Sequence, residues 1–212
     1  MAKPPADQGE RYETSRQNRH RYRRGVGLWR RHRPQICRRG GKGDAGRHNN
    51  AGTTHLPGPL EQVSEADFDR VFAVNAKSVF LTAREIVPLM KAAKTGAILN
   101  VASTAGVSPR PNLNWYNASK GWMITATRTM AVELAPFGIR VNAINPVAGE
   151  TPLLKSFMGQ DTPEIRAKFL STIPLGRFST PEDMGNAAAF LCSDEASMIT
   201  GVAMEVDGGR CI

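Results

Sequence analysis

The sequence predicts an α/β protein with a doubly wound parallel sheet, and alternating strand and helix patterns are the main evidence. Residues 97–102 form a short apolar run that is typical of a buried strand. Residues 114–134 are compatible with one long helix, which is followed by Pro136. Residues 139–144 predict a second strand, which stops at Asn145-Pro146. This alternation is typical of parallel strands joined by helices that cover both faces of the sheet.

Other elements have clear start signals. Ser64 opens a Ser-Glu-Ala-Asp segment that resembles a capping box, so we expect a helix that begins there and fades near residues 91–94. Thr162 and Thr180 each stand before a proline, which is favoured at the first helical position, and they predict two further helices. Residues 202–206 predict the last strand.

The candidate chemistry lies at Tyr116 and Lys120, which stand on one face of the predicted helix, one turn apart. A lysine cation beside a phenol favours the phenolate, so we expect Lys120 to lower the pKa of Tyr116 toward working pH. A tyrosine tuned in this way can exchange a proton with an alcohol or carbonyl oxygen. The hydroxyl of Ser103 could hold that oxygen in place.

The spacing alone also fits an ordinary surface pair on a helix. The surroundings favour the catalytic interpretation. Ser103 directly follows the predicted strand of residues 97–102, and open α/β sheets bind their ligands at the carboxyl ends of the strands. Tyr116 and Lys120 fall in the first turns of the helix that follows, so all three side chains are expected at this edge.

Further motifs stand in a fixed order around these residues: Asn-Asn-Ala-Gly at 49–52, Asn75 in Val-Asn-Ala-Lys, Asn145-Pro146 followed by Thr151, Pro-Leu-Gly-Arg-Phe at 174–178, and Val-Asp-Gly-Gly at 206–209. With Ser103, Tyr116 and Lys120, they make residues 49–212 resemble the short-chain dehydrogenase/reductase family, whose fold is Rossmann-like. The 3-oxoacyl-carrier-protein reductase branch is the nearest subgroup. Val147 departs from the pattern, because the family usually has glycine there and this chain has Gly149 two places on.

The resemblance implies an oxidoreductase that uses NAD or NADP and acts on a small-molecule alcohol or carbonyl, with a 3-oxoacyl compound as one candidate. Tyr116 would be the general acid/base, and Lys120 would lower its pKa and bind the nicotinamide ribose. Ser103 would hold the substrate oxygen, and Asn75 would anchor a relay water. The cofactor would be bound by Asn50, Ala51, Gly52, Tyr116, Lys120, Pro146, Gly149 and Thr151.

Three implications keep alternatives open. Asn75 is expected to break its helix locally, although an ordinary surface amide would also fit. The apolar residues of 151–178 fit a mobile substrate lid by resemblance, and a pair of core-packing helices fits them equally well. Family members usually pair through the helix that carries Tyr116, so a homodimer or homotetramer is expected.

Residues 1–48 do not fit the family pattern. Residues 1–50 hold 14 of the 28 basic residues but only 4 of the 19 acidic ones, so the net charge of +9 comes from this segment. The family opens with Thr-Gly-x-x-x-Gly-x-Gly, which binds the pyrophosphate at a helix N-terminus, and no such motif stands here. We therefore expect an irregular basic segment, 1–48, and the C-terminal part of a dehydrogenase domain, 49–212, with the sheet incomplete at its N-terminal half.

Four interpretations of the basic segment remain open. It could bind nucleic acid, serve as an organelle transit peptide, or form a disordered basic tail. The fourth is a reading-frame error: shifted by one nucleotide, the codons of residues 22–30 permit Thr-Gly-Ala-Gly-Ser-Gly-Phe-Gly. We hypothesise that residues 20–43 are a frame-shifted remnant of the cofactor loop. The chain would then be an inactive truncated fragment, and a basic-tailed interaction protein is the other alternative to an enzyme.

Composition bounds the remaining possibilities. No apolar run approaches the roughly 18 residues of a membrane span, and no secretory signal is visible. Cys37, Cys192 and Cys211 are too few and too scattered for a disulfide framework or a metal site. We expect a cytoplasmic protein with no metal, no membrane contact and no nucleic-acid partner for the domain.

Overall fold

The computed structural model describes most of the chain after residue 45, namely residues 46–49, 52–151 and 153–212. The frame-shift hypothesis for residues 20–43 lies outside this part, as do the expected cofactor residues Asn50 and Ala51. The division of the chain near residue 48 stays a prediction for the same reason.

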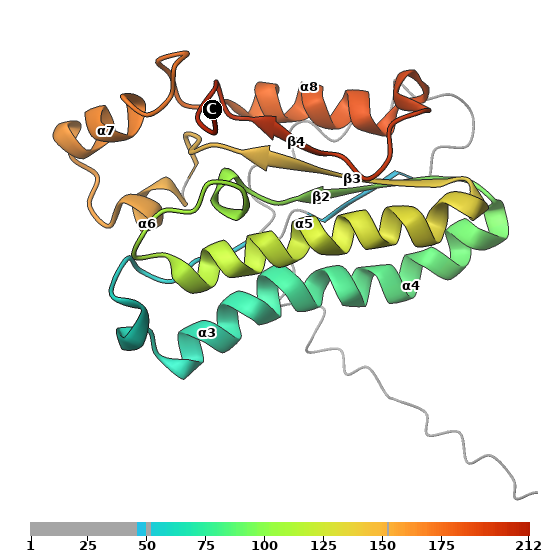
Figure 1. Ribbon diagram of the computed structural model, residues 1–212, viewed down its shortest axis with the longest axis horizontal. Coiled ribbons are helices and arrows are strands. Elements are labelled where there is room, and N and C mark those ends of the chain that lie inside the picture. Colours follow the sequence, from blue (N-terminus) through green and yellow to red (C-terminus); the bar gives the residue numbers. More distant parts are fainter. Residues whose placement is uncertain (1–45, 50–51, 152) are drawn as a thin grey trace, which may run out of the picture.

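The described strands form one parallel sheet in the order β1-β2-β3-β4 (Figure 1). They are β1 (Gly46–Asn49), β2 (Gly96–Val101), β3 (Ile139–Pro146) and β4 (Ala203–Val206). Each neighbouring pair is parallel, as the alternation of strands and helices predicts. The strands β1 and β4 lie at the two edges of the described sheet.

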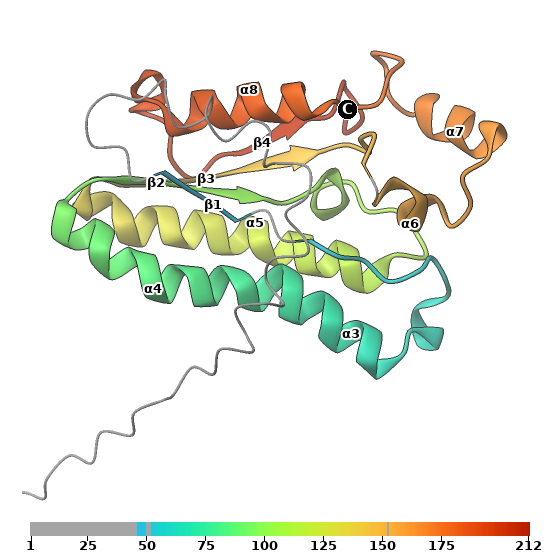
Figure 2. The ribbon, with the colours of Figure 1, turned by 180° about the vertical axis from the view of Figure 1, so that it is seen from behind.

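Helices cover both faces of this sheet, which confirms the doubly wound architecture (Figures 1 and 2). One face carries α3 (Glu65–Phe72), α4 (Ser78–Ala93) and α5 (Asn114–Leu134), and the other carries α8 (Pro181–Cys192). Two short helices, α6 (Leu154–Met158) and α7 (Pro163–Leu170), lie at the end toward which the strands point.

The core follows from the alternation of side chains along the strands. Ile98 of β2 packs with Val141 of β3 on the α5 face, while Leu99 points to the opposite face and packs with α8. Both faces are covered, so β2 is a nearly continuous apolar run, and the polar Arg140 and Asn142 of β3 donate hydrogen bonds to the Leu191 and Ile199 carbonyls. The helix–sheet–helix core therefore holds the carboxyl ends of β2 and β3 in fixed positions.

The predicted helix boundaries agree closely with the structure. The α5 helix has the predicted bounds, and the Ser64 hydroxyl caps α3 by accepting a hydrogen bond from the Asp67 backbone N–H at 3.1 Å. Thr180 and Asp183 form a reciprocal capping box at α8. The segment that follows Ser64 is not one continuous α-helix, because a π-helical turn at Ala73–Lys77 interrupts it. This turn contains Asn75 and confirms the expected local break.

The segment between β3 and α8 packs around its own apolar cluster. Leu154 and Met158 of α6 contact Val147, Ile173 and Phe178, while the main core clusters lie between the sheet and the long helices. Among the described helices, none has the length and apolar character of a membrane span. Within the same residues, no group of His, Cys, Asp or Glu side chains is arranged to hold a metal ion.

Candidate active site

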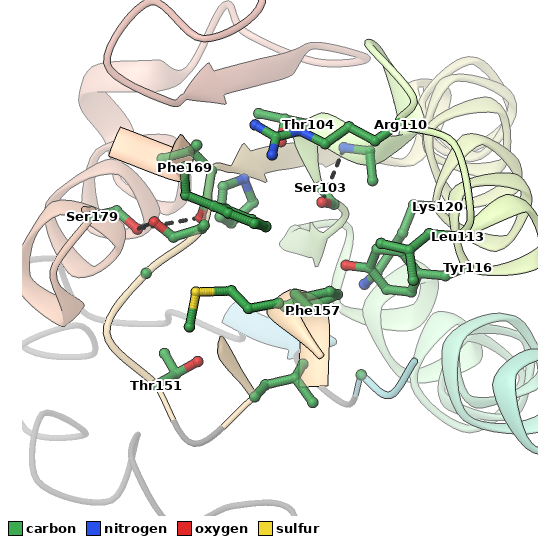
Figure 3. Close-up of a pocket in the computed structure, with 18 of the residues that line it drawn as sticks. Ser103, Thr104, Arg110, Leu113, Tyr116, Lys120, Thr151, Phe157, Phe169 and Ser179 are labelled. Atoms are coloured by element: carbon green, nitrogen blue, oxygen red, sulfur yellow. Dashed lines mark hydrogen bonds between the residues drawn. The ribbon is translucent and has the colours of Figure 1, made fainter. Parts of the chain in front are cut away.

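A cavity of about 980 Å³ opens at the carboxyl ends of β2 and β3 (Figure 3). Its wall comes from the loops after these strands, from the start of α5 and from α6 and α7. Most of the site residues that the sequence predicts line this cavity: Gly52, Ser103, Tyr116, Lys120, Pro146, Gly149 and Thr151. Asn75 lies outside this lining.

The structure brings Ser103, Tyr116 and Lys120 together from two elements. Ser103 follows β2, and its Oγ accepts a hydrogen bond from the Ala105 backbone N–H at 3.1 Å. Tyr116 and Lys120 lie on the first turns of α5 and are only 5 % and 4 % exposed. The Lys120 Nζ donates to the Val101 carbonyl oxygen at 2.8 Å, and Figure 3 shows it behind the Tyr116 ring. The packing of α5 therefore keeps bulk water away from the Tyr116 and Lys120 side chains.

Burial governs the acidity of this pair. Desolvation raises the pKa of Tyr116 to about 12, and a hydrogen bond with Ser103 opposes that rise. Desolvation also lowers the pKa of Lys120 to about 8. The expectation that Lys120 lowers the pKa of Tyr116 is therefore wrong for this structure. The Lys120 ammonium is directed at the Val101 carbonyl and lies 6.0 Å from the centre of the phenol ring, so burial outweighs its field.

Asn75 has a different environment from the one expected. Its side chain is fully buried; Oδ1 accepts from the Thr53 N–H, and Nδ2 donates to the Thr53 carbonyl and to Ser119 Oγ, each at 2.9 Å. Both amide hydrogens are thus used within the protein. The side chain ties the loop after β1 to the buried face of α5, which excludes the surface-amide interpretation. A relay water would have to bind another atom of this turn.

Lys120 also offers the clearest test of whether a nicotinamide cofactor fits. An ammonium has three N–H donors, and the Lys120 group has one acceptor among the described residues. A Cβ placed on Gly52 would lie 3.7 Å from Nζ, so the Gly52 backbone borders the same amine. A buried lysine with unused donors beside a glycine-containing loop fits a ligand rich in hydroxyl groups, such as a ribose.

Several residues that line the cavity carry no clear signal in the sequence. The Phe157 ring packs against the Tyr116 ring with centroids 5.1 Å apart. The Arg110 guanidinium lies 4.7 Å from the centre of the Phe169 ring. Phe157 and Phe169 come from the segment expected as a lid, and Arg110 comes from the β2–α5 loop. Loop positions follow no periodic pattern, so only the three-dimensional structure identifies them.

Comparison with known proteins establishes the family. A family model described as Enoyl-(Acyl carrier protein) reductase matches residues 34–210. The 4-formylbenzenesulfonate dehydrogenase of Comamonas testosteroni is 53 % identical over 165 residues, which cover 77 % of this chain and 66 % of that protein. The chain belongs to the short-chain dehydrogenase/reductase family. It spans slightly less than two thirds of the length of this curated relative.

Solved structures agree with this assignment. A 3-ketoacyl-(acyl-carrier-protein) reductase from Brucella melitensis in complex with NADH has 51 % identity and a TM-score of 0.74, covering 79 % of this chain and 67 % of that one. A protein from Beutenbergia cavernae, assigned as an NAD(P)-dependent gluconate 5-dehydrogenase, has NADP bound at low occupancy. It has 35 % identity and a TM-score of 0.73, covering 78 % of this chain and 65 % of that one.

The acidities of Tyr116 and Lys120 can be measured by NMR on selectively labelled protein, with the Y116F and K120M variants identifying the signals. We expect the Tyr116 ring to remain a neutral phenol at about pH 10, the ordinary tyrosine midpoint, because burial raises its pKa to about 12. We expect the Lys120 amine to titrate with a midpoint of about 8. A Tyr116 midpoint near neutrality in the free protein would contradict this description of the site.

The same lysine predicts a pH dependence of stability. The pKa of Lys120 in the folded protein, about 8, lies below its ordinary value of 10.5. The unfolded chain therefore binds more protons between these two values, so the contribution of this group to the free energy of unfolding rises with pH across that window. Urea unfolding of the wild type and K120M at several pH values isolates this contribution.

Proposed function

We propose that residues 49–212 carry the proton-transfer part of an oxidoreductase that uses NAD or NADP and interconverts an alcohol and a carbonyl compound. The observation that carries this proposal is that Ser103 and the buried Tyr116 and Lys120 line one cavity at the carboxyl edge of the sheet. Membership of the short-chain dehydrogenase/reductase family supports the reaction class.

The proposed chemistry divides between the chain and its cofactor. When bound, the nicotinamide supplies or accepts the hydride. Tyr116 remains protonated at neutral pH, so in the reductive direction its phenol donates a proton to the carbonyl oxygen. Ser103 holds that oxygen through its hydroxyl. Lys120 has a pKa of about 8 and lies on the same helix, so it can exchange protons near working pH and stabilise the phenolate that remains.

The cofactor would lie along the glycine-containing side of the cavity. Gly52, Pro146, Gly149 and Thr151 line this side, with Asn50 and Ala51 next to Gly52 in the sequence. The unused donors of Lys120 would bind the ribose. One similar structure contains NADH and another contains NADP, so either dinucleotide is a candidate. The substrate is an alcohol or carbonyl compound, and a 3-oxoacyl compound is one candidate, in keeping with the Brucella reductase.

The location and assembly complete the proposal. We infer a cytoplasmic location, where a free thiol such as that of Cys211 stays reduced. The helices α4 and α5 leave Leu89 and Val132 70 % and 77 % exposed. Large exposed apolar side chains favour association, so we infer a homodimer or homotetramer that buries these helices.

Hydride transfer tests the reaction class directly. The chain is incubated with a panel of aldehydes and ketones and with NADH or NADPH carrying deuterium at C4, and deuterium in the alcohol product is measured by mass spectrometry. General acid catalysis is worth about 100-fold or more, so Y116F should lower the rate by at least that factor. T129A removes an exposed hydroxyl from α5 and should leave the rate unchanged. An equal rate in Y116F, or no deuterium transfer at any cofactor concentration, would contradict the proposal.

Cofactor affinity is a separate prediction. Residues 1–48 contain no Thr-Gly-x-x-x-Gly-x-Gly motif, and the backbone N–H groups of that motif bind the pyrophosphate. We therefore expect this chain to bind NADH and NADPH weakly, with no saturation in the micromolar range. Titration followed by nicotinamide fluorescence measures this, and a micromolar dissociation constant would show that other residues replace the missing motif.

A further inference from the structure

Arg110 is held firmly at the wall of the cavity that contains Ser103 and Tyr116. Its backbone carbonyl accepts a hydrogen bond from Asn117 Nδ2 at 2.8 Å, which fixes the loop between β2 and α5. Its guanidinium donates to Thr172 Oγ1 at 2.7 Å and lies over the Phe169 ring. Figure 3 shows the guanidinium above Phe169 and on the Ser103 side of the cavity. These contacts fix the position of a positive charge.

The charge of Arg110 is not balanced by a carboxylate in the part of the chain that the structure describes. Burial lowers the pKa of Arg110, the positive charge of nearby Arg210 lowers it further, and Cys211 opposes the shift. The Nε atom of Arg210 is buried and has no hydrogen-bond partner within the described structure. Lys168 on α7 adds a third cation to the cavity wall. Within the described residues, none of these three side chains forms an ion pair with an Asp or Glu.

Two neighbouring, partly buried guanidinium groups such as those of Arg110 and Arg210 are costly unless an anion joins them, since like charges repel and burial removes water from them. A guanidinium forms paired hydrogen bonds with planar or tetrahedral oxyanions. The cavity wall also has apolar side chains beside these groups: Phe157 packs on Tyr116, Phe169 lies under Arg110, and Leu113 is part of the lining. The cavity thus combines oxygen-binding groups, apolar side chains and a cation on its wall.

We propose that Arg110 anchors an anionic substrate: an alcohol or carbonyl compound with an apolar, ring-sized body and a carboxylate or sulfonate that binds the guanidinium while the reacting oxygen lies at Ser103 and Tyr116. This inference rests on the proposed function, because it takes Ser103 and Tyr116 as the reacting end. Arg110 is then a specificity-determining residue.

Direct binding tests this without cofactor or turnover. Three probes of similar size are titrated by calorimetry or ligand-observed NMR: 4-(hydroxymethyl)benzoate, 4-(hydroxymethyl)benzenesulfonate and neutral 4-methylbenzyl alcohol. We expect at least one anionic probe to bind about tenfold or more tightly than the neutral alcohol, which is the size of a charge-assisted hydrogen bond. R110M should abolish this preference, and R110K should retain part of it. The anion that binds more tightly identifies the preferred group.

Two control variants separate anion binding from other effects. R128M removes one positive charge from an exposed position on α5 and should keep the preference. T172V removes the hydrogen bond that holds Arg110 but leaves its charge, so it should also keep most of the preference. Equal binding of all three probes by the wild type would overturn the proposal. So would a preference that survives in R110M, or a loss in T172V as large as in R110M. Failure of deuterium transfer would contradict only the proposed function.

Discussion

The burial of one face of α5 is the constraint on which the site depends. Ser119, Met123 and Thr127 on this face are completely inaccessible to solvent, and Lys120 is nearly so. The helix approaches the loop after β2 so closely that a Cβ on Gly106 would lie 2.8 Å from the backbone carbon of Lys120. Because Tyr116 and Lys120 are on this helix, its close packing sets both their positions and their exclusion from water.

Exclusion from water sets the protonation of both groups. Burial raises the pKa of Tyr116, so its phenol is protonated at neutral pH. Burial also lowers the pKa of Lys120 to about 8, so this lysine titrates near working pH. A positive charge also lies on the cavity wall, where Arg110 is supported by Asn117 and Thr172. The same cavity thus has a proton donor and a cation, which together would orient an anionic substrate.

Local patterns in the sequence predicted the parts of the fold that repeat regularly. The bounds of α5, the strands β2 and β3, and the position of Ser103 follow from apolar periodicity and capping residues. The acidity of Tyr116 could not be predicted in this way, because spacing places Lys120 on the same face but does not show that its ammonium turns to Val101. Arg110 was missed for a related reason: a single loop residue gains its role from contacts with distant segments.

The central claim is that close packing of α5 against the loop after β2 causes the low pKa of Lys120. The most direct test is the pKa of Lys120 in G106A, where the added methyl group must push α5 away from the loop. G185A is the matched control, since a Cβ on Gly185 meets no atom within 4 Å. We predict that the pKa of Lys120 stays at about 8 in G185A and rises toward 10.5 in folded G106A. A pKa of about 8 in both variants would contradict the claim.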